Sequence, residues 1–308
     1  MSILVDESTR LLVQGITGRE AANFTRECMD YGTQVVSGVT PGKGGAEVFG
    51  VPVYDTVAKA VAETAPNVAL VSVPPALTLD AVREAIDAGI PLLVVITERI
   101  PRKDVSLMLL AARAAGVRIV GPNSLGVITP ERAKVGSIGG TPIDVRRAYR
   151  PGPVGIMSRS GGMTTELASI FSQAGIGQST CVSVGGDPLI GVPLLEAYKL
   201  FEADPETEAV VFFSEPGGSQ ELALADYVRE AGARTPLVGF LAGRFVDDMP
   251  GTRFGHAGAM IQRGGMVTTE KVALLEEAGI AIASRLGDLP ELVRATGVRP
   301  NLSESEAA

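Results

Sequence analysis

The sequence predicts an α/β protein built from two doubly wound, mostly parallel sheets. Continuous apolar, β-rich runs alternate with helix-like segments along most of the 308 residues. Such runs indicate parallel strands that are covered by helices on both faces of a sheet. The 37 glycines gather at the ends of these runs, where strand-to-helix turns need them.

The first half of the chain repeats a strand, a Gly-rich turn and a helix, which is typical of a Rossmann-like domain. We assign this domain to residues 1–130. The expected strands are 11–14, a strand that starts at 35, 68–73, 92–96 and 117–120. The expected helices are 19–31, 77–88 and 103–115.

Residues 131–152 are predicted to be a linker, because the periodicity lapses and Gly, Pro and Arg accumulate there. A second α/β series follows over 153–297. Its expected strands are 154–157, 180–184, 209–213, 237–241 and 280–283, and its expected helices are 163–174, 194–202, 220–231 and 269–278. Residues 298–308 are polar and acidic, so we expect a loose tail.

Composition excludes several classes of function. The formal net charge is −8 and no basic stripe interrupts it, so a nucleic-acid partner is not expected. The N-terminus has no basic flank, and no apolar run is long enough to span a bilayer, so a soluble cytoplasmic protein without a membrane role is expected. Cys28 and Cys181 have no metal or redox spacing. We expect two buried thiols and no metal site.

The strand ends of the second domain are small and polar. They carry the segments 158–162, 185–187 and 215–218, and a later loop carries 255–258. Because ligands of an open parallel sheet gather beyond the carboxyl ends of its strands, we expect these four segments to surround one cavity.

His256 is the only histidine of the chain. A lone histidine is more often structural than catalytic, but Gly255, Ala257 and Gly258 are too small to bury an imidazole in a core. A neutral imidazole is a good nucleophile toward phosphorus near pH 7. We therefore expect His256 to be accessible and to accept a phosphoryl group.

A phosphohistidine needs preformed hydrogen-bond donors. The turn with Ser158, Ser160, Gly161 and Gly162 ends a strand and opens a helix, so hydroxyls and free amides would meet there; a plain helix cap is the alternative. A second helix start at 217–219 could supply more amides. Glu215 could accept the proton of the other imidazole nitrogen, although a solvated loop carboxylate is equally compatible with its position.

Together these segments resemble the α subunit of succinyl-CoA synthetase and its relatives. The resemblance runs through 1–4, 32–33, 38–45, 158–161, 177–182, 185–188, 204–209 and 255–259. It implies a flavodoxin-like second domain, and a His256 that is phosphorylated by ATP or GTP held with Mg on an ATP-grasp β subunit. An acyl phosphate would then form on a small carboxylic acid, and CoA would displace the phosphate. It assigns Glu215 to His256.

The resemblance also implies that the first domain binds CoA. Its contacts would fall on Thr17, Gly18, Arg19, Glu20, Lys43, Ile96, Thr97 and Glu98. A turn at 15–18 that opens a helix can cradle a pyrophosphate, and a lysine between two glycines suits a phosphate, although an ordinary turn lysine is the alternative. Residues 38–44 do not form a Walker A loop, which fits a triphosphate bound elsewhere.

Four positions depart from the family pattern. Arg19 and Glu20 replace small or amide side chains, and the Glu needs a partner or must point away. Thr165 stands where a tyrosine lies near the substrate, and Ser124 replaces a common cysteine. Residues 139–152 and 158–163 look more like citryl-CoA synthetase and the matching part of ATP-citrate lyase. Within the ligase interpretation, succinate is the first expected acid, with citrate or malate as alternatives.

Two other classes of protein compete with the ligase. An NAD-dependent dehydrogenase predicts an acidic residue at the end of the second strand, where this chain has Ser37–Thr40. A non-catalytic CoA-binding regulatory protein would not need His256, Glu215 and the 158–162 turn together.

Overall fold

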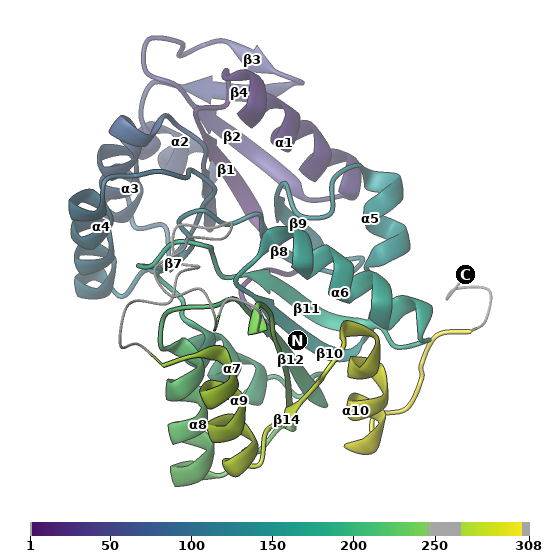
Figure 1. The fold of residues 1–308 in the computed structure, drawn as a ribbon. Coiled ribbons are helices and arrows are strands. Elements are labelled where there is room, and N and C mark those ends of the chain that lie inside the picture. The colour runs from purple at the N-terminus through teal and green to yellow at the C-terminus, as the bar shows by residue number, and fades with distance from the viewer. Residues whose placement is uncertain (1, 245–246, 248–265, 304–308) are drawn as a thin grey trace.

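The computed structural model describes residues 2–244, 247 and 266–303, and these form two α/β domains, each around its own sheet (Figure 1). The first sheet has the strand order β3-β4-β2-β1-β5-β6-β7. Its strands are β1 (Arg10–Gln14), β2 (Gln34–Val39), β3 (Glu47–Val48), β4 (Val51–Tyr54), β5 (Val68–Val71), β6 (Leu92–Val95) and β7 (Arg118–Val120). Its helices are α1 (Arg19–Tyr31), α2 (Val57–Thr64), α3 (Thr78–Asp87) and α4 (Arg102–Ala115).

The second sheet has the strand order β14-β13-β12-β10-β11-β8-β9. Its strands are β8 (Gly126–Thr129), β9 (Ala133–Gly136), β10 (Pro151–Ser158), β11 (Gln178–Ser183), β12 (Ala209–Ser214), β13 (Leu237–Leu241) and β14 (Ala281–Ile282). Its helices are α5 (Pro142–Ala148), α6 (Gly161–Gln173), α7 (Leu194–Glu202), α8 (Gln220–Ala231), α9 (Thr268–Glu277) and α10 (Leu289–Ala295).

Both strand orders confirm the predicted fold class. From β4 to β7 the first sheet is parallel, and its order is that of a Rossmann fold. From β14 to β11 the second sheet is parallel, and its order is that of flavodoxin. In each sheet the strand order reverses at one point, between β1 and β5 in the first sheet and between β10 and β12 in the second. Each sheet therefore has one switch point where a ligand can bind.

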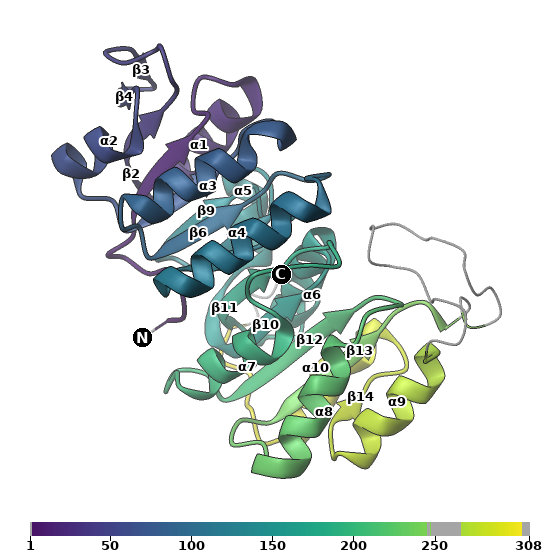
Figure 2. The same cartoon turned by 90° about the vertical axis from the view of Figure 1, so that its left-hand side faces the viewer.

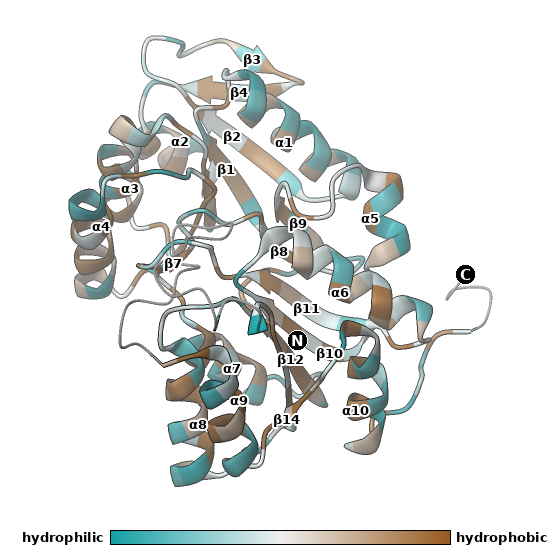
Figure 3. Ribbon diagram, in the orientation of Figure 1, coloured by the Kyte–Doolittle hydropathy of each residue, from teal (hydrophilic) through white to brown (hydrophobic). Residues whose placement is uncertain are grey.

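Apolar side chains account for these strands and helices. Strands β5, β6, β8, β9, β11 and β12 are buried along their whole length. Coloured by hydropathy, strands such as β1 and β12 are largely brown, whereas helix α1 carries much teal (Figure 3). In the view turned by 90°, α3 and α4 lie over the first sheet, and α7, α8 and α9 lie in the second domain (Figure 2).

The stretch 131–152, expected to be a linker, differs from that expectation. Strand β9 pairs antiparallel with β8, and β8 pairs antiparallel with β11, so this hairpin extends the second sheet. Helix α5 follows and packs against α6. Two four-residue strands joined by a tight turn give no helical period, which is why the sequence pattern lapses here. We propose that the second domain begins at β8.

The C-terminal segment is also more ordered than a loose tail. Val298 is buried, and the Asn301 side chain accepts a hydrogen bond from the Gly177 amide at 2.8 Å and donates to the Pro151 carbonyl at 2.8 Å. The amides of Asn301 and Leu302 both donate to the Gly175 carbonyl. Residues 298–302 are therefore fixed to the second domain, and polar composition alone did not reveal these contacts.

Candidate functional site

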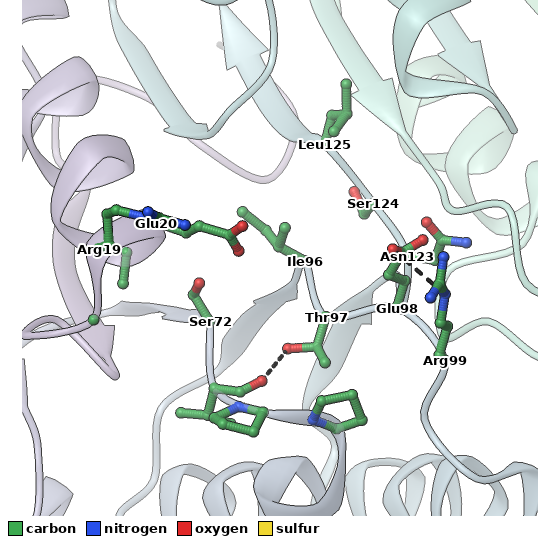
Figure 4. A pocket seen from close by; sticks show the side chains of 15 residues that line it. Arg19, Glu20, Ser72, Ile96, Thr97, Glu98, Arg99, Asn123, Ser124 and Leu125 are labelled. Atoms are coloured by element: carbon green, nitrogen blue, oxygen red, sulfur yellow. Dashed lines mark hydrogen bonds and ion pairs between the residues drawn. The ribbon is translucent and has the colours of Figure 1, made fainter.

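A cavity of about 650 Å³ lies at the switch point of the first sheet. Its walls come from the segments that follow β1, β5, β6 and β7, together with the start of α1 (Figure 4). This is the edge where the carboxyl ends of parallel strands meet, and it is the place where doubly wound sheets bind their ligands.

Six of the eight residues expected to bind CoA line this cavity. They are Gly18, Arg19, Glu20, Ile96, Thr97 and Glu98. Thr17 lies beside this group, and its hydroxyl hydrogen-bonds to that of Thr40 at 3.2 Å. Lys43 is exposed on the loop after β2 and is not part of the wall. Glu20 does not point away, as one expectation allowed, because its carboxylate is directed into the cavity (Figure 4).

The turn before α1 gives the cavity a floor of open backbone amides. Gly15 has φ +82°, and a Cβ atom built on it would lie 2.4 Å from the Ser72 carbonyl oxygen, so only glycine fits. Gly18 is the N-cap of α1 and makes no side-chain cap. The first amides of α1 are thus open to an anion, and the helix dipole favours negative charge there.

Three polar residues of this wall were not predicted from the sequence: Ser72, Arg99 and Asn123. Arg99 has φ +61°, which is unusual for a residue with a side chain, and its guanidinium lies 3.7 Å from the Glu98 carboxylate. Arg99 lies beside Asn123 at the cavity (Figure 4). Its place directly after the 96–98 segment was the one sequence signal that could have identified it.

The loop that carries Lys43 is held by Asp55. The Gly44 amide donates to the Asp55 carboxylate at 2.9 Å, and a Cβ atom on Gly44 would lie 2.4 Å from that carboxylate. Hydrogen bonds from the backbone of Gly44, and then of Gly42 and Lys43, lower the pKa of Asp55 below its usual value. A carboxylate therefore fixes the glycine-rich loop in place.

The second candidate region lies at the switch point of the second sheet, between β10 and β12. The 158–162 turn joins β10 to α6 as expected, with Ser160 as the N-cap that accepts from the Met163 amide. Gly161 is buried, and a Cβ atom on it would lie 2.1 Å from Leu125 Cγ, whereas Gly162 is exposed. The first amides of α6 have no partner within the helix, as at any helix start.

The Ser158 hydroxyl does not point out of this turn. It donates to the Ser160 carbonyl at 2.7 Å and accepts from the Ser160 amide at 3.1 Å, and the residue is fully buried. Ser158 therefore braces the turn, and the residues of this turn that stay accessible are half-buried Ser160 and exposed Gly162.

The segment after β12 carries Glu215 and leads into α8. Glu215 is half-buried, and its carbonyl accepts from Arg159 Nη1 at 3.3 Å. Arg159 is 2% exposed and also donates to the Gly217 carbonyl at 3.2 Å, so it ties the two helix starts together. No role for Arg159 was predicted from the sequence, although an arginine between two serines at a strand end was an available signal.

Thr165 lies on the first turns of α6, where its hydroxyl shares a 2.9 Å hydrogen bond with the hydroxyl of buried Tyr149. Desolvation of Tyr149 raises the pKa of its phenol well above the usual value, so the phenol stays protonated near neutral pH. The Thr165 hydroxyl is thus part of the packing between α5 and α6.

The segment 121–125 joins the two regions. Asn123 and Leu125 line the cavity of the first domain, and Leu125 packs directly on Gly161 at the start of α6. The Asn123 side chain donates to Asp187 at 3.0 Å, and the Asn123 carbonyl accepts from the Gly186 amide. The departure Ser124 donates to the Ser183 carbonyl. The wall of the cavity is therefore anchored in the second sheet.

His256 lies outside the described residues. Within the ranges that the structure describes, no group of three or more His, Cys, Asp or Glu residues is arranged to hold a metal ion. None of the helices in those ranges is long and apolar enough to cross a membrane. Cys28 and Cys181 are both free and buried, as expected, and desolvation raises the pKa of Cys28 to about 11.

Comparison with known proteins gives consistent matches. Models of a CoA binding domain and of a CoA-ligase match residues 6–99 and 157–282. The α 2 subunit of the ADP-forming succinate–CoA ligase of Archaeoglobus fulgidus is 44% identical over 293 residues, which cover 95% of this chain and 99% of that protein. The corresponding α subunit of Aquifex aeolicus is 43% identical over 95% of this chain and 94% of its own.

Solved structures agree on the fold. ATP citrate lyase from Methanothrix soehngenii, in complex with citrate and coenzyme A, superposes with a TM-score of 0.87 at 24% identity. The match covers 98% of this chain and 53% of that one. An apo dinucleotide-forming acetyl-coenzyme A synthetase 1 from Ca. Korarchaeum cryptofilum gives a TM-score of 0.74 at 20% identity, over 94% of this chain and 61% of its own.

Proposed function

The chain belongs to the family of succinate–CoA ligase α subunits, and from that premise we propose that it is the CoA-binding, phosphoryl-carrying subunit of a nucleoside-diphosphate-forming acid–CoA ligase. The observation that carries the proposal is the pairing of two switch-point sites through one segment. A cavity with open helix amides in the first domain and the start of α6 in the second share the wall 121–125.

CoA is the ligand proposed for the cavity of the first domain. The amides at the start of α1 and the guanidinium groups of Arg19 and Arg99 suit its phosphates. Thr17 and Lys43 lie outside the wall, so we assign them to the parts of CoA that extend beyond the cavity. The thiol of CoA would then approach the second domain along Asn123 and Leu125.

The phosphoryl group is proposed to travel through His256. An imidazole nitrogen attacks the γ-phosphorus of ATP or GTP, and the nucleoside diphosphate leaves. A carboxylate oxygen of the acid then attacks phosphorus and releases the imidazole. The CoA sulfur attacks the acyl carbon, phosphate leaves, and the thiol proton goes to phosphate or solvent. These steps balance and need no oxidant or reductant.

The residues around the two helix starts are proposed to serve this transfer. Glu215 would hold the second imidazole nitrogen, and Ser160 with the amides of Gly161 and Gly162 would hold the phosphoryl oxygens. We retain Ser158 as the residue that shapes this turn, in line with its hydrogen bonds to Ser160.

The triphosphate is proposed to bind, with Mg, on a β subunit of the ATP-grasp type. The absence of a Walker A sequence in this chain supports the binding of the triphosphate by another subunit. The two reduced cysteines suit the cytoplasm, where we place the protein. No role for nucleic acid or membrane forms part of the proposal.

Succinate is the proposed acid, because the relatives with 40–44% identity are named for it. Citrate and malate are the alternatives. Thr165 stays a candidate for contact with the acid, although its hydroxyl would first have to leave Tyr149. Thioester formation by the complex with its β subunit, measured across succinate, malate and citrate, separates these acids.

Replacement of the proposed phosphoryl carrier tests the function directly. In the complex with the β subunit, we expect His256→Ala to lose the acid-labile phosphoenzyme and to lower thioester formation by on the order of a thousandfold or more. CoA binding by the first domain should not change. Arg229→Ala, at the exposed far end of α8, is the matched control and should keep both activities. Thioester synthesis by His256→Ala at the wild-type rate would leave a non-catalytic CoA-binding role as the better proposal.

A further inference from the structure

A buried ion pair lies directly beneath the start of α8. The Lys271 side chain on α9 is 3% exposed and the Glu221 side chain on α8 is 0% exposed, and Lys271 Nζ lies 3.1 Å from Glu221 Oε2. The Ser214 hydroxyl, at the end of β12, donates to the other oxygen of the same carboxylate. Three elements of the second domain are thus joined by one charged group.

The two remaining donors of the lysine go to the loop rather than to a side chain. Lys271 Nζ donates to the Gly218 carbonyl at 2.8 Å and to the Gly217 carbonyl at 3.1 Å. An ammonium has three N–H donors, so all three are accounted for. Arg159 also donates to the Gly217 carbonyl, at 3.2 Å. Two buried cations therefore draw the loop carbonyls inward.

This arrangement fixes the direction of the loop amides. In a trans peptide the C=O and N–H groups point in opposite directions. Because the carbonyls of Gly217 and Gly218 face Lys271, the amides of Gly218 and Ser219 face away from it. Both residues are exposed, and the N-cap Ser219 makes no side-chain cap hydrogen bond. Gly217 has φ +84° and Gly218 has φ +72°, values that glycine adopts without strain.

Stability does not explain the ion pair by itself. Taking both charges out of water is costly, and apolar or neutral replacements of buried pairs are often equally stable. The Nε atom of Arg159 is buried without a hydrogen-bond partner, so the region retains an unused donor next to Glu215. The lysine donates hydrogen bonds to two consecutive carbonyls, those of Gly217 and Gly218, which an apolar side chain could not do.

We propose that Lys271 is a positioning residue: paired with Glu221, it holds the carbonyls of Gly217 and Gly218 inward, so that the amides of Gly218 and Ser219 face the transferred phosphoryl group. This inference rests on the proposed function, because it concerns the binding of phosphate by the same subunit. It adds residues of α8 and α9 that do not themselves touch the reacting atoms.

The test uses the complex with the β subunit and the double variant Lys271→Met/Glu221→Gln. This change removes both charges, and the Gln carbonyl can still accept from Ser214. The measurement is the KM for inorganic phosphate when phosphoenzyme forms from the thioester and phosphate. We expect this KM to rise about 10- to 100-fold, because the amides of Gly218 and Ser219 would no longer point at the phosphate and would bind it more weakly. The affinity for CoA should not change.

A second buried lysine provides a matched control. The Lys134 side chain is 0% exposed and its Nζ donates to Glu27 at 2.9 Å and to the Gly140 carbonyl at 2.9 Å, between α1 and β9. Lys134→Met/Glu27→Gln removes another pair with a buried lysine, between α1 and β9, so the KM for phosphate should stay at the wild-type value. If the Lys271 variant fails to fold, Arg159→Gln removes the other cation that donates to the Gly217 carbonyl and carries the same expectation.

The possible results separate the two proposals. An unchanged phosphate KM in the Lys271 double variant, or an equal rise in the Lys134 control, overturns the positioning role while leaving the phosphohistidine in place. A wild-type complex that forms no phosphoenzyme overturns the proposed function and this inference together.

Discussion

Gly15→Ala is the sharpest test of how the backbone builds the proposed CoA site. Gly15 lies in the turn between β1 and α1, with φ +82° and a built Cβ only 2.4 Å from the Ser72 carbonyl oxygen. Alanine meets two separate obstacles there. One is the left-handed backbone conformation, and the other is the collision with a backbone atom that no side-chain rotation can relieve.

Gly89 allows the two obstacles to be separated. It has φ +81°, nearly the same as Gly15, but a Cβ atom there meets nothing within 4 Å. Gly89→Ala should therefore cost the conformational strain alone, about 1 kcal/mol. Gly15→Ala adds the collision, for which overpacking suggests about 1–3 kcal/mol more. The expected loss in the free energy of unfolding is thus about 2–4 kcal/mol for Gly15→Ala.

The assays are denaturant unfolding for stability and titration calorimetry for CoA. We expect Gly15→Ala to bind CoA at least about tenfold more weakly, because relief of the collision must move the turn that opens α1. Gly89→Ala should bind CoA as the wild type does. Equal losses of stability in the two variants, or unchanged CoA affinity in Gly15→Ala, would refute the close approach of β1 and β5 as the basis of the site.

Two further predictions concern titrating groups. Cys28, whose pKa burial raises to about 11, and Cys181, whose pKa desolvation also raises, should react with a disulfide reagent at pH 8 only as fast as the protein unfolds; rapid labelling of the native protein would contradict their burial. Asp55 has a folded-state pKa below 3.8, so its hold on the loop of Lys43 is complete above that pH and is lost as the pH falls through the folded value. At neutral pH, Asp55→Ala should weaken CoA binding a few fold by calorimetry, and unchanged affinity would exclude this loop from the CoA site.

The parallel strands were predictable because their physical signal is local. Strands such as β6 and β12 are continuous apolar runs, and helices such as α7 and α8 follow the expected ranges to the residue. The hairpin β8–β9 was not predictable in this way. Its membership of the second sheet depends on pairing with β11, about fifty residues further along the chain, and on no local pattern. The contact of Asn301 with Gly177 could not be predicted from the sequence for the same reason, because the two residues are far apart along the chain.

In the candidate sites, too, residues with a local sequence signal were predictable and residues placed by long-range contacts were not. Residues at strand ends, such as Gly18 and Thr97, could be named from the sequence because the fold class fixes where those ends meet. Lys271 could not be named, since a lysine on an amphipathic helix normally faces water. Its burial follows from the tertiary contact of α9 with α8 and with the loop before α8. A residue such as Lys271, which supports the loop of a site without touching a ligand, can therefore be identified from the structure but not from a sequence motif.

The geometry of segment 121–125 makes the two domains one functional unit. Asn123 faces the cavity of the first domain and is fixed by Asp187 of the second, and Leu125 leaves no room for a Cβ atom on Gly161. A shift of either domain would therefore move the cavity wall and the start of α6 together. A thioester-forming enzyme needs this coupling, because the CoA sulfur and the phosphorylated acid must meet within bonding distance in a site that excludes water. The shared wall connects the cavity with the start of α6 through packed side chains and hydrogen bonds rather than through a flexible linker.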